Sequence, residues 1–275
     1  MTPIRIISFN SVFNTKLDRD SNNGESLKRE MKLIQQIDKL QEDNDVINLQ
    51  GVLINKNDKY FNIHDYFSMF DNNLFQVYTV QIVHSPIISM FLLTAIRKSS
   101  FLSYECYSPK FFLSPIGVKN KPIIINATTI DNKKIRIINI DIPANNRYIT
   151  LYLESLSQYI NTDIPCILVG DLYQIEINKY RSYFMSLLEK YVTNITYPLF
   201  DKEGYELNGT YYGLETNKTK RTNDFLIKSD YIFIKNISEH SNIITPFELK
   251  NKLIYEDNRK ERATSHFCMS LTVNI

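Results

Sequence analysis

The stretch Ile167-Leu168-Val169-Gly170-Asp171-Leu172-Tyr173 contains a run of apolar residues that ends in a Gly-Asp pair. The apolar run predicts a buried strand, and the Gly-Asp pair predicts a turn that places the carboxylate of Asp171 at the strand end. In α/β proteins, strand ends that carry acidic residues are common places for metal and phosphate chemistry. The stretch therefore predicts an α/β fold with a polar site at the strand ends.

Four other predicted strand ends carry polar residues in the same manner. They are Ile7-Ser8-Phe9-Asn10, Ile47-Asn48-Leu49-Gln50-Gly51, Ile138-Asn139-Ile140-Asp141 and Thr264-Ser265-His266-Phe267. Strand ends that are so far apart in the chain can contribute to one site only if the fold gathers them at the same edge. Together they predict a single site assembled from distant segments.

The order of these strand ends resembles the endonuclease/exonuclease/phosphatase superfamily, whose members include deoxyribonuclease I, and the likeness spans nearly the whole chain. Asn10 matches a strand-end Asn of the family, Asp171 the Asp of its Gly-Asp-x-Asn motif, and His266 the His of its Ser-Asp-His motif. The segment Ser229-Asp230-Tyr231-Ile232 is similar to the start of the family's Asp-Tyr-Ile strand. The resemblance implies a four-layer α/β-sandwich and chemistry on phosphodiesters.

Four residues depart from the family pattern. Gly51 replaces a Glu that binds Mg²⁺, Asp141 a phosphate-binding His, Tyr173 the Asn of Gly-Asp-x-Asn, and Ser265 the Asp that precedes the His. Cleavage of a phosphodiester anion requires a positive centre, which Mg²⁺ supplies when carboxylates hold it. Because losing one preorganised electrostatic group costs about 100 to 1000-fold in rate, these departures predict that ordinary turnover is lost.

The leading hypothesis is therefore a catalytically impaired phosphodiesterase-fold protein, a pseudoenzyme, retained for binding nucleic acid or a protein partner. In this hypothesis Asn10, Asp171 and His266 are the remnant of the catalytic site, and no cofactor is expected. Taken singly, each of these residues is more often a turn, cap or hydrogen-bonded structural residue than a catalytic one. Tyr173 would either stack on a base or occupy the place of the scissile phosphate.

The alternative hypothesis is an active nuclease or phosphoesterase that hydrolyses phosphodiester bonds with Mg²⁺ or Mn²⁺. In this case Asp141 and Asp171 would hold the metal in a rearranged geometry, with Glu176 as a further candidate ligand. A third hypothesis is a purely structural role in a larger assembly, with Tyr173 and other side chains filling the old cleft.

Two groups of basic residues lie in predicted loops that, by the resemblance, flank the active face. They are Lys218, Lys220 and Arg221, and Arg259, Lys260 and Arg262. Basic side chains in such loops would bind the phosphates of RNA or DNA. The alternative is solvated loop charge, partly balanced by Glu256, Asp257 and Glu261. The net charge of +2 does not by itself indicate a nucleic-acid-binding protein.

Composition limits the class of protein. A chain of 275 residues with 43% hydrophobic residues suits one domain over residues 1–275. No apolar run approaches the length of a membrane span and the first residues do not form a secretory signal, which predicts a soluble intracellular protein. Cys106, Cys166 and Cys268 are odd in number and widely separated, which predicts free thiols, and the spacing of cysteines and histidines argues against zinc.

Hydrophobic periodicity predicts the order of the secondary structure. Strands are expected over 5–9, 45–49, 76–83, 89–97, 122–128, 134–140, 165–169, 209–212, 230–234 and 269–274, and helices over 25–41, 147–160 and 179–191. Gly51 is expected to allow a tight exit from the second of these strands. Such an order of elements predicts two mixed sheets packed face to face with helices outside.

Overall fold

The computed structural model describes residues 3–11, 34–35, 37–55, 67–84, 88–107, 109, 121–142, 146–171, 188, 190–193, 195–196, 211–213, 225–227, 230–240 and 269–275. One sheet contains β1 (Ile4–Asn10), β2 (Val46–Asn55), β3 (Phe75–His84), β4 (Ile88–Arg97), β13 (Glu239–His240) and β14 (Met269–Asn274). The other contains β5 (Phe101–Tyr107), β6 (Ile123–Thr129), β7 (Lys134–Asp141), β8 (Cys166–Asp171), β9 (Ile195–Thr196) and β12 (Asp230–Lys235). Two short strands, β10 (Tyr211–Gly213) and β11 (Phe225–Ile227), pair with each other. The described helical elements with defined bounds are α3 (Asn146–Ile160) and the 3₁₀ turn η1 (Lys98–Ser100).

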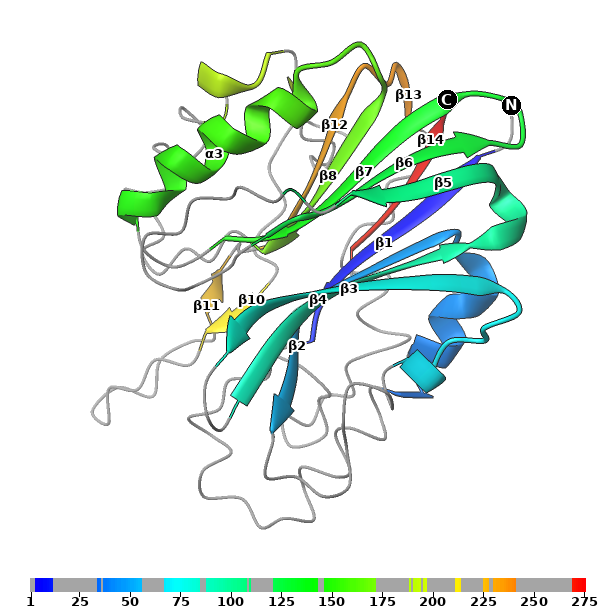
Figure 1. Cartoon of the computed structure of the whole chain (residues 1–275), viewed down its shortest axis with the longest axis horizontal. Helices are drawn as coiled ribbons and strands as arrows, with labels where there is room; N and C mark the ends of the chain where they lie inside the picture. Colours follow the sequence, from blue (N-terminus) through cyan, green and yellow to red (C-terminus); the bar gives the residue numbers. More distant parts are fainter. Residues whose placement is uncertain are drawn as a thin grey trace.

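Both sheets are mixed, because each contains parallel and antiparallel strand pairs. In the described part of the chain, the strand orders are β13-β14-β1-β2-β4-β3 and β5-β6-β7-β8-β12-β9. In the first sheet β1 runs antiparallel to β14 and parallel to β2. In the second, β7 runs antiparallel to β6 and parallel to β8, with α3 as the crossover between the two parallel strands. Figure 1 shows α3 lying across the outer side of this second sheet.

Three apolar contact layers explain why the elements stack in this order. Between the sheets, apolar side chains such as Ile6 and Leu92 of the first sheet are buried with Ile125 and Ile137 of the second. The described helical residues 37–43 cover the outer side of the first sheet, where Ile37 and Leu40 are buried against side chains of β1, β2 and β4. On α3, Leu153, Leu156 and Ile160 are buried against the second sheet. The predicted α/β-sandwich with outer helices is confirmed.

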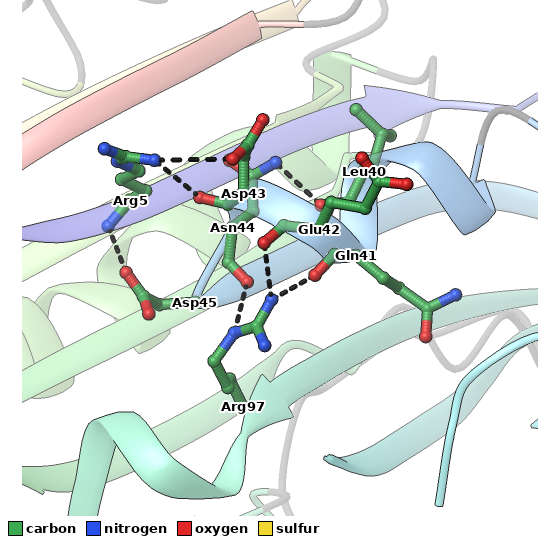
Figure 2. Close-up of polar contacts among 8 residues, drawn as sticks. All are labelled: Arg5, Leu40, Gln41, Glu42, Asp43, Asn44, Asp45 and Arg97. Carbon is green, nitrogen blue, oxygen red and sulfur yellow. Dashed lines mark hydrogen bonds and ion pairs between the residues drawn. The ribbon is translucent and has the colours of Figure 1, made fainter.

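The sandwich has two different ends. We call the end where β1, β2, β7 and β8 finish the site end, and the end where they begin the basal end. At the basal end Arg97 caps the carbonyl groups at the end of helix 37–43 (Figure 2), donating from Nε to Asn44 O at 3.1 Å, from Nη2 to Glu42 O at 3.2 Å, and to Gln41 O. These carbonyls have no partner within the helix, so the guanidinium satisfies groups that would otherwise need water.

The second sheet uses an arginine in the same way. Arg136 of β7 donates from Nη1 to the carbonyl oxygen of Tyr159 at the end of α3 and from Nε to Asn126 Oδ1 at 2.7 Å. A positive charge at a helix C-terminus also interacts favourably with the helix dipole. One arginine in each sheet, Arg97 in the first and Arg136 in the second, therefore attaches the covering helix to that sheet at the basal end.

The bounds of most predicted elements on the described residues agree with the structure within one or two residues. The strand predicted over 45–49 is wrong at its end, because β2 continues through Gly51 to Asn55 and no exit occurs there. The predicted helices 25–41 and 179–191 lie largely outside the described residues, although the first extends to residue 43. Strands β5, β9, β11 and β13 were not predicted, since two-residue and three-residue strands carry no periodicity and most side chains of β5 are exposed or partly exposed. No described helix is long and apolar enough to cross a membrane.

Candidate functional site

The layer between the sheets changes from apolar to polar toward the site end. Along β1 the buried residues facing this layer are Ile4 and Ile6 and then Ser8 and Asn10; along β2 they are Val46 and then Asn48 and Gln50; along β7 they are Ile135 and Ile137 and then Asn139. Three strands therefore change character at the same height. Because alternate residues share one face of a strand, the polar residues form a continuous buried layer at this end.

A hydrogen-bonded network joins the two sheets through this layer. Gln50 Nε2 of β2 donates to Asn139 Oδ1 of β7 at 2.8 Å and to Ser8 Oγ of β1 at 3.1 Å. Asn139 Nδ2 is within bonding distance of Leu93 O at 3.0 Å and Thr94 Oγ1 at 3.1 Å. Asn139 of the second sheet is thus bonded directly to β2 and β4 of the first sheet and is linked to Ser8 of β1 through Gln50.

The network continues into the first sheet. The Thr94 hydroxyl donates to Asn48 Oδ1 at 2.9 Å, and Asn48 Nδ2 donates to the carbonyl oxygen of Ile7 at 3.1 Å. Gln50, Thr94 and Asn48 are fully buried and Asn139 is 1% exposed. Burying amide groups is costly unless they are bonded, so a connected set of this kind favours one arrangement of the sheets over others.

Gly51 lies next to this network in an irregularity of β2. It has a φ of 60°, between Leu49 and Val52 where the pairing with β4 shifts register. A residue with a Cβ pays about 1–2 kcal/mol for that backbone conformation. Gly51 brings no side chain, and the amide of Gln50 is committed to Asn139 and Ser8, so neither residue fits a carboxylate-type Mg²⁺ ligand on this side of the site.

Three acidic residues meet on the opposite side of the site. In the second sheet Asp141 of β7 pairs in register with Asp171 of β8, and Asp171 pairs with Asp230 of β12. Neighbouring strands are about 4.8 Å apart, so the backbone brings the three positions into one row. We call Asp141, Asp171 and Asp230 the acidic row.

The structure adds Asp230 to the residues predicted for the site. Its signal was present in the sequence, because it begins a strand within the segment similar to the family's Asp-Tyr-Ile. Its place beside Asp171 could not be read from that signal, since the pairing of β8 with β12 joins residues 59 positions apart along the chain, at 171 and 230. Among the side chains that the structure describes, no group of three or more His, Cys, Asp or Glu is arranged to hold a metal ion.

Gly170 allows the row to form. A Cβ at this position would lie 2.1 Å from the carbonyl oxygen of Ile140 and 2.6 Å from its Cγ1. Any larger residue would therefore push β8 away from β7 immediately beside Asp171. The Gly-Asp pair forms the last two residues of β8, so Asp171 ends the strand as predicted, and the glycine allows β8 to approach β7 closely.

Burial raises the pKa of other ionisable groups near the strands. Burial raises the pKa of the Tyr152 phenol on α3 well above its usual range, and the charge of Asp141 adds to this effect. Burial also raises the pKa of the Cys106 thiol to about 11 and that of Cys166 to about 12. Both cysteines are free, as predicted, and their thiols stay protonated at neutral pH, which makes them poor nucleophiles.

The structure locates only part of the predicted site. Asn10, 2% exposed at the end of β1, pairs in register with Gln50, while Asp141 and Asp171 end adjacent strands in the other sheet. The remaining candidates lie outside the described residues and stay predictions. They are Cys268, Tyr173, Glu176, His266, Lys218, Lys220, Arg221, Arg259, Lys260 and Arg262.

Comparisons with known proteins identify the fold. No protein-family model matches the chain, and no curated protein matches it by sequence. Solved structures do match. An endonuclease/exonuclease/phosphatase family protein from Leptotrichia buccalis aligns with a TM-score of 0.63 and 13% identity over 99% of this chain and 100% of that chain. D. rerio TDP2, complexed with a single-strand DNA product, aligns with a TM-score of 0.64 and 15% identity over 100% of both chains.

A third match is the human Nocturnin catalytic domain with a bound sulfate anion, with a TM-score of 0.60 and 15% identity over 99% of this chain and 94% of that chain. Identities this low show a common architecture and leave activity open. The likeness covers the full length, and the two mixed sheets with outer helices agree with it. The chain therefore has the fold of the endonuclease/exonuclease/phosphatase, or deoxyribonuclease I-like, superfamily.

Proposed function

We propose that this chain binds a phosphodiester ligand, with single-stranded nucleic acid as the favoured class, at the site end without the metal-dependent hydrolysis usual for its fold. The observation that carries the proposal is the Gln50-Gly51 pair. Gly51 has no side chain where the family resemblance places a metal-binding carboxylate, and Gln50 is turned into the layer between the sheets. Without that carboxylate, positions 50 and 51 provide no ligand that would hold a cation against a phosphate.

Two observations support nucleic acid as the ligand. The D. rerio TDP2 structure contains a single-strand DNA product and the Nocturnin structure a sulfate anion, so relatives in fold bind anions of this kind. The predicted basic loops carry six cationic residues, from Lys218 to Arg221 and from Arg259 to Arg262. These charges would offset the acidic row, which by itself repels phosphates. A protein partner is the other ligand class that the sequence leaves open.

The acidic row favours a second candidate function, metal-dependent hydrolysis of phosphodiesters. Three in-register aspartates are the kind of oxygen ligand that Mg²⁺ and Mn²⁺ prefer. Another protein with this fold, ANGEL2, is a 2',3'-cyclic phosphatase and aligns with a TM-score of 0.62 and 13% identity over 98% of this chain and 94% of that chain. In this candidate the cation would be held on the second sheet alone.

Hydrolysis separates the two candidates. Purified protein is expected to give no Mg²⁺- or Mn²⁺-dependent product from single-stranded DNA, RNA, inositol phosphates or sphingomyelin, because removal of one preorganised group already costs about 100 to 1000-fold. The measurement is product formation against an Asp171→Asn preparation made in parallel. Metal-dependent product that is lost in Asp171→Asn and Asp141→Asn, but retained in Asp131→Asn at the basal end, would establish the second candidate instead.

Binding tests the proposal directly. Fluorescence anisotropy with labelled single-stranded DNA and RNA is expected to show binding that the triple variant Arg259→Glu, Lys260→Glu, Arg262→Glu weakens strongly. Each phosphate contact contributes about 0.7 to the slope of log K against log salt for single strands, so the loss of three contacts lowers the slope by about 2. The matched control is Lys98→Glu, Lys133→Glu, Lys134→Glu, whose exposed side chains belong to the basal end.

Both triple variants change the net charge from +2 to −4, since 2 − 6 = −4, so a nonspecific charge effect would weaken both equally. Equal weakening, or no binding by the wild-type protein at low salt, contradicts the proposed function. Retained binding in the basal variant together with loss in the loop variant supports it.

A further inference from the structure

The two halves of the site end lie on different sheets. Asn10 ends β1 of the first sheet, while the acidic row belongs to β7, β8 and β12 of the second. A ligand that contacts both halves depends on how far one sheet is offset from the other. Away from the site end the sheets meet through apolar side chains, and apolar packing is not directional. A hydrogen bond between the sheets near the site fixes their offset more strictly.

Gln50 holds the end of β1 through three hydrogen bonds. Its Nε2 donates to Ser8 Oγ at 3.1 Å, and its carbonyl oxygen accepts from Ser11 N at 2.9 Å and from Ser11 Oγ at 3.0 Å. Ser8 and Ser11 lie on either side of Asn10 along the chain, and Asn10 itself pairs in register with Gln50. A shift of Gln50 would therefore carry Asn10 with it.

Asn139 forms the other end of the link. Its Oδ1 accepts from Gln50 Nε2 at 2.8 Å, and it lies two residues before Asp141 on β7. Because alternate residues of a strand share one face, Asn139 and Asp141 lie on the same face of β7. Asp141 in turn pairs in register with Asp171. A continuous path of contacts thus runs from the end of β1 through Gln50 and Asn139 to the acidic row.

The two amides can adopt one arrangement only. Both side chains are buried, and Asn139 Nδ2 also donates to the carbonyl oxygen of Leu93 at 3.0 Å. If the Gln50 amide alone turned over, its oxygen would face Asn139 Oδ1, with no proton between the two acceptors. If both amides turned over, Asn139 Oδ1 would face the carbonyl oxygen of Leu93. Since an unmade buried hydrogen bond is costly, the link is fixed in length and direction.

From these contacts we infer that Gln50 and Asn139 are positioning residues, which set the offset between Asn10 and the acidic row. Gln50 is fully buried and Asn139 is 1% exposed, so neither side chain touches a ligand at the surface. The inference rests on the proposed function, because it requires a phosphodiester ligand that contacts both halves of the site. Binding sites have to be held within about 0.5 Å by their supporting groups, so loosening this link weakens binding through geometry alone.

Removing one methylene from Gln50 tests the inference. Gln50→Asn keeps the amide but shortens its reach, and it is expected to lower the affinity for labelled single-stranded DNA, measured by fluorescence anisotropy, by about tenfold. The matched control is Gln41→Asn, which shortens another buried glutamine at the basal end, where Nε2 donates to Met69 O at 2.7 Å. Each variant loses a buried hydrogen bond, so general destabilisation affects both. The control is expected to bind as the wild-type protein does.

A second measurement needs no ligand. In Gln50→Asn the backbone amide resonances of Asp141 and Asp171 are expected to shift, because the changed residue acts on the second sheet through Asn139. Gln41→Asn is expected to leave both resonances in place. If Gln50→Asn folds poorly, Gln50→Met replaces it, with Gln41→Met as its control, since methionine keeps the length of the side chain without the amide.

The outcomes separate the inference from the proposed function. Wild-type affinity in Gln50→Asn, or an equal loss in Gln41→Asn, overturns the inference while the proposed function stands. Failure of the wild-type protein to bind single strands contradicts the proposed function instead, and the resonances then decide the inference by themselves. Unshifted resonances of Asp141 and Asp171 overturn it in every case.

Discussion

Replacing Asn139 with leucine is expected to destabilise the fold by about 3–5 kcal/mol, because leaving a buried donor or acceptor without a partner costs about 1–3 kcal/mol each. The substitution removes the acceptor of Gln50 Nε2 and the donor to Leu93 O and Thr94 Oγ1. None of these groups can turn to water, since Gln50 and Thr94 are fully buried. Urea unfolding followed by circular dichroism measures the change.

A double-mutant cycle tests the cause of that loss. Gln50→Leu alone should also destabilise the protein, but Asn139→Leu combined with Gln50→Leu should cost less than the sum of the two, because the second change removes a group that the first leaves unbonded. The expected coupling is about 1–2 kcal/mol. Strict additivity would mean that the hydrogen bond between Gln50 and Asn139 does not contribute to stability, and that each leucine destabilises the protein only by packing poorly between the sheets.

Gly170→Ala is expected to cost about 2–3 kcal/mol, the upper part of the range that overpacking a core typically costs. The added Cβ would lie 2.1 Å from the carbonyl oxygen of Ile140, and a backbone atom of a central strand cannot rotate away. Thermal unfolding of the variant gives the magnitude. The comparison is Gly51→Ala, where the penalty comes from a φ of 60° and is expected to be about 1–2 kcal/mol.

The position of Gly170 also gives this variant a functional readout. If β8 moves away from β7, Asp171 loses its register with Asp141 and the acidic row opens. Binding of single-stranded nucleic acid should then change by more in Gly170→Ala than in Gly51→Ala at a temperature where both are folded. A Gly170→Ala protein as stable as the wild type would show that the close contact between β7 and β8 relaxes without cost.

Much of the architecture was readable from local patterns. Runs such as 134–140 and 269–274 have the alternation of a half-buried strand or the apolar content of a fully buried one, and both became strands. Strand β5 was missed because it is an edge, and exposed edge residues need not alternate in hydrophobicity. The exit predicted at Gly51 was wrong, since a glycine indicates an unusual backbone conformation but not whether the strand ends or bulges there.

The chain's sequence alone determined which residue types stand at the candidate positions, with a glycine at position 51 and carboxylates at Asp141 and Asp171. These are properties of single positions, and they follow from local hydrophobicity and turn chemistry. Tertiary structure decided that Gln50 binds Asn139 across the sandwich and that Asp230 joins the acidic row. Each of these depends on pairing and register between segments distant in the chain, which no local pattern encodes.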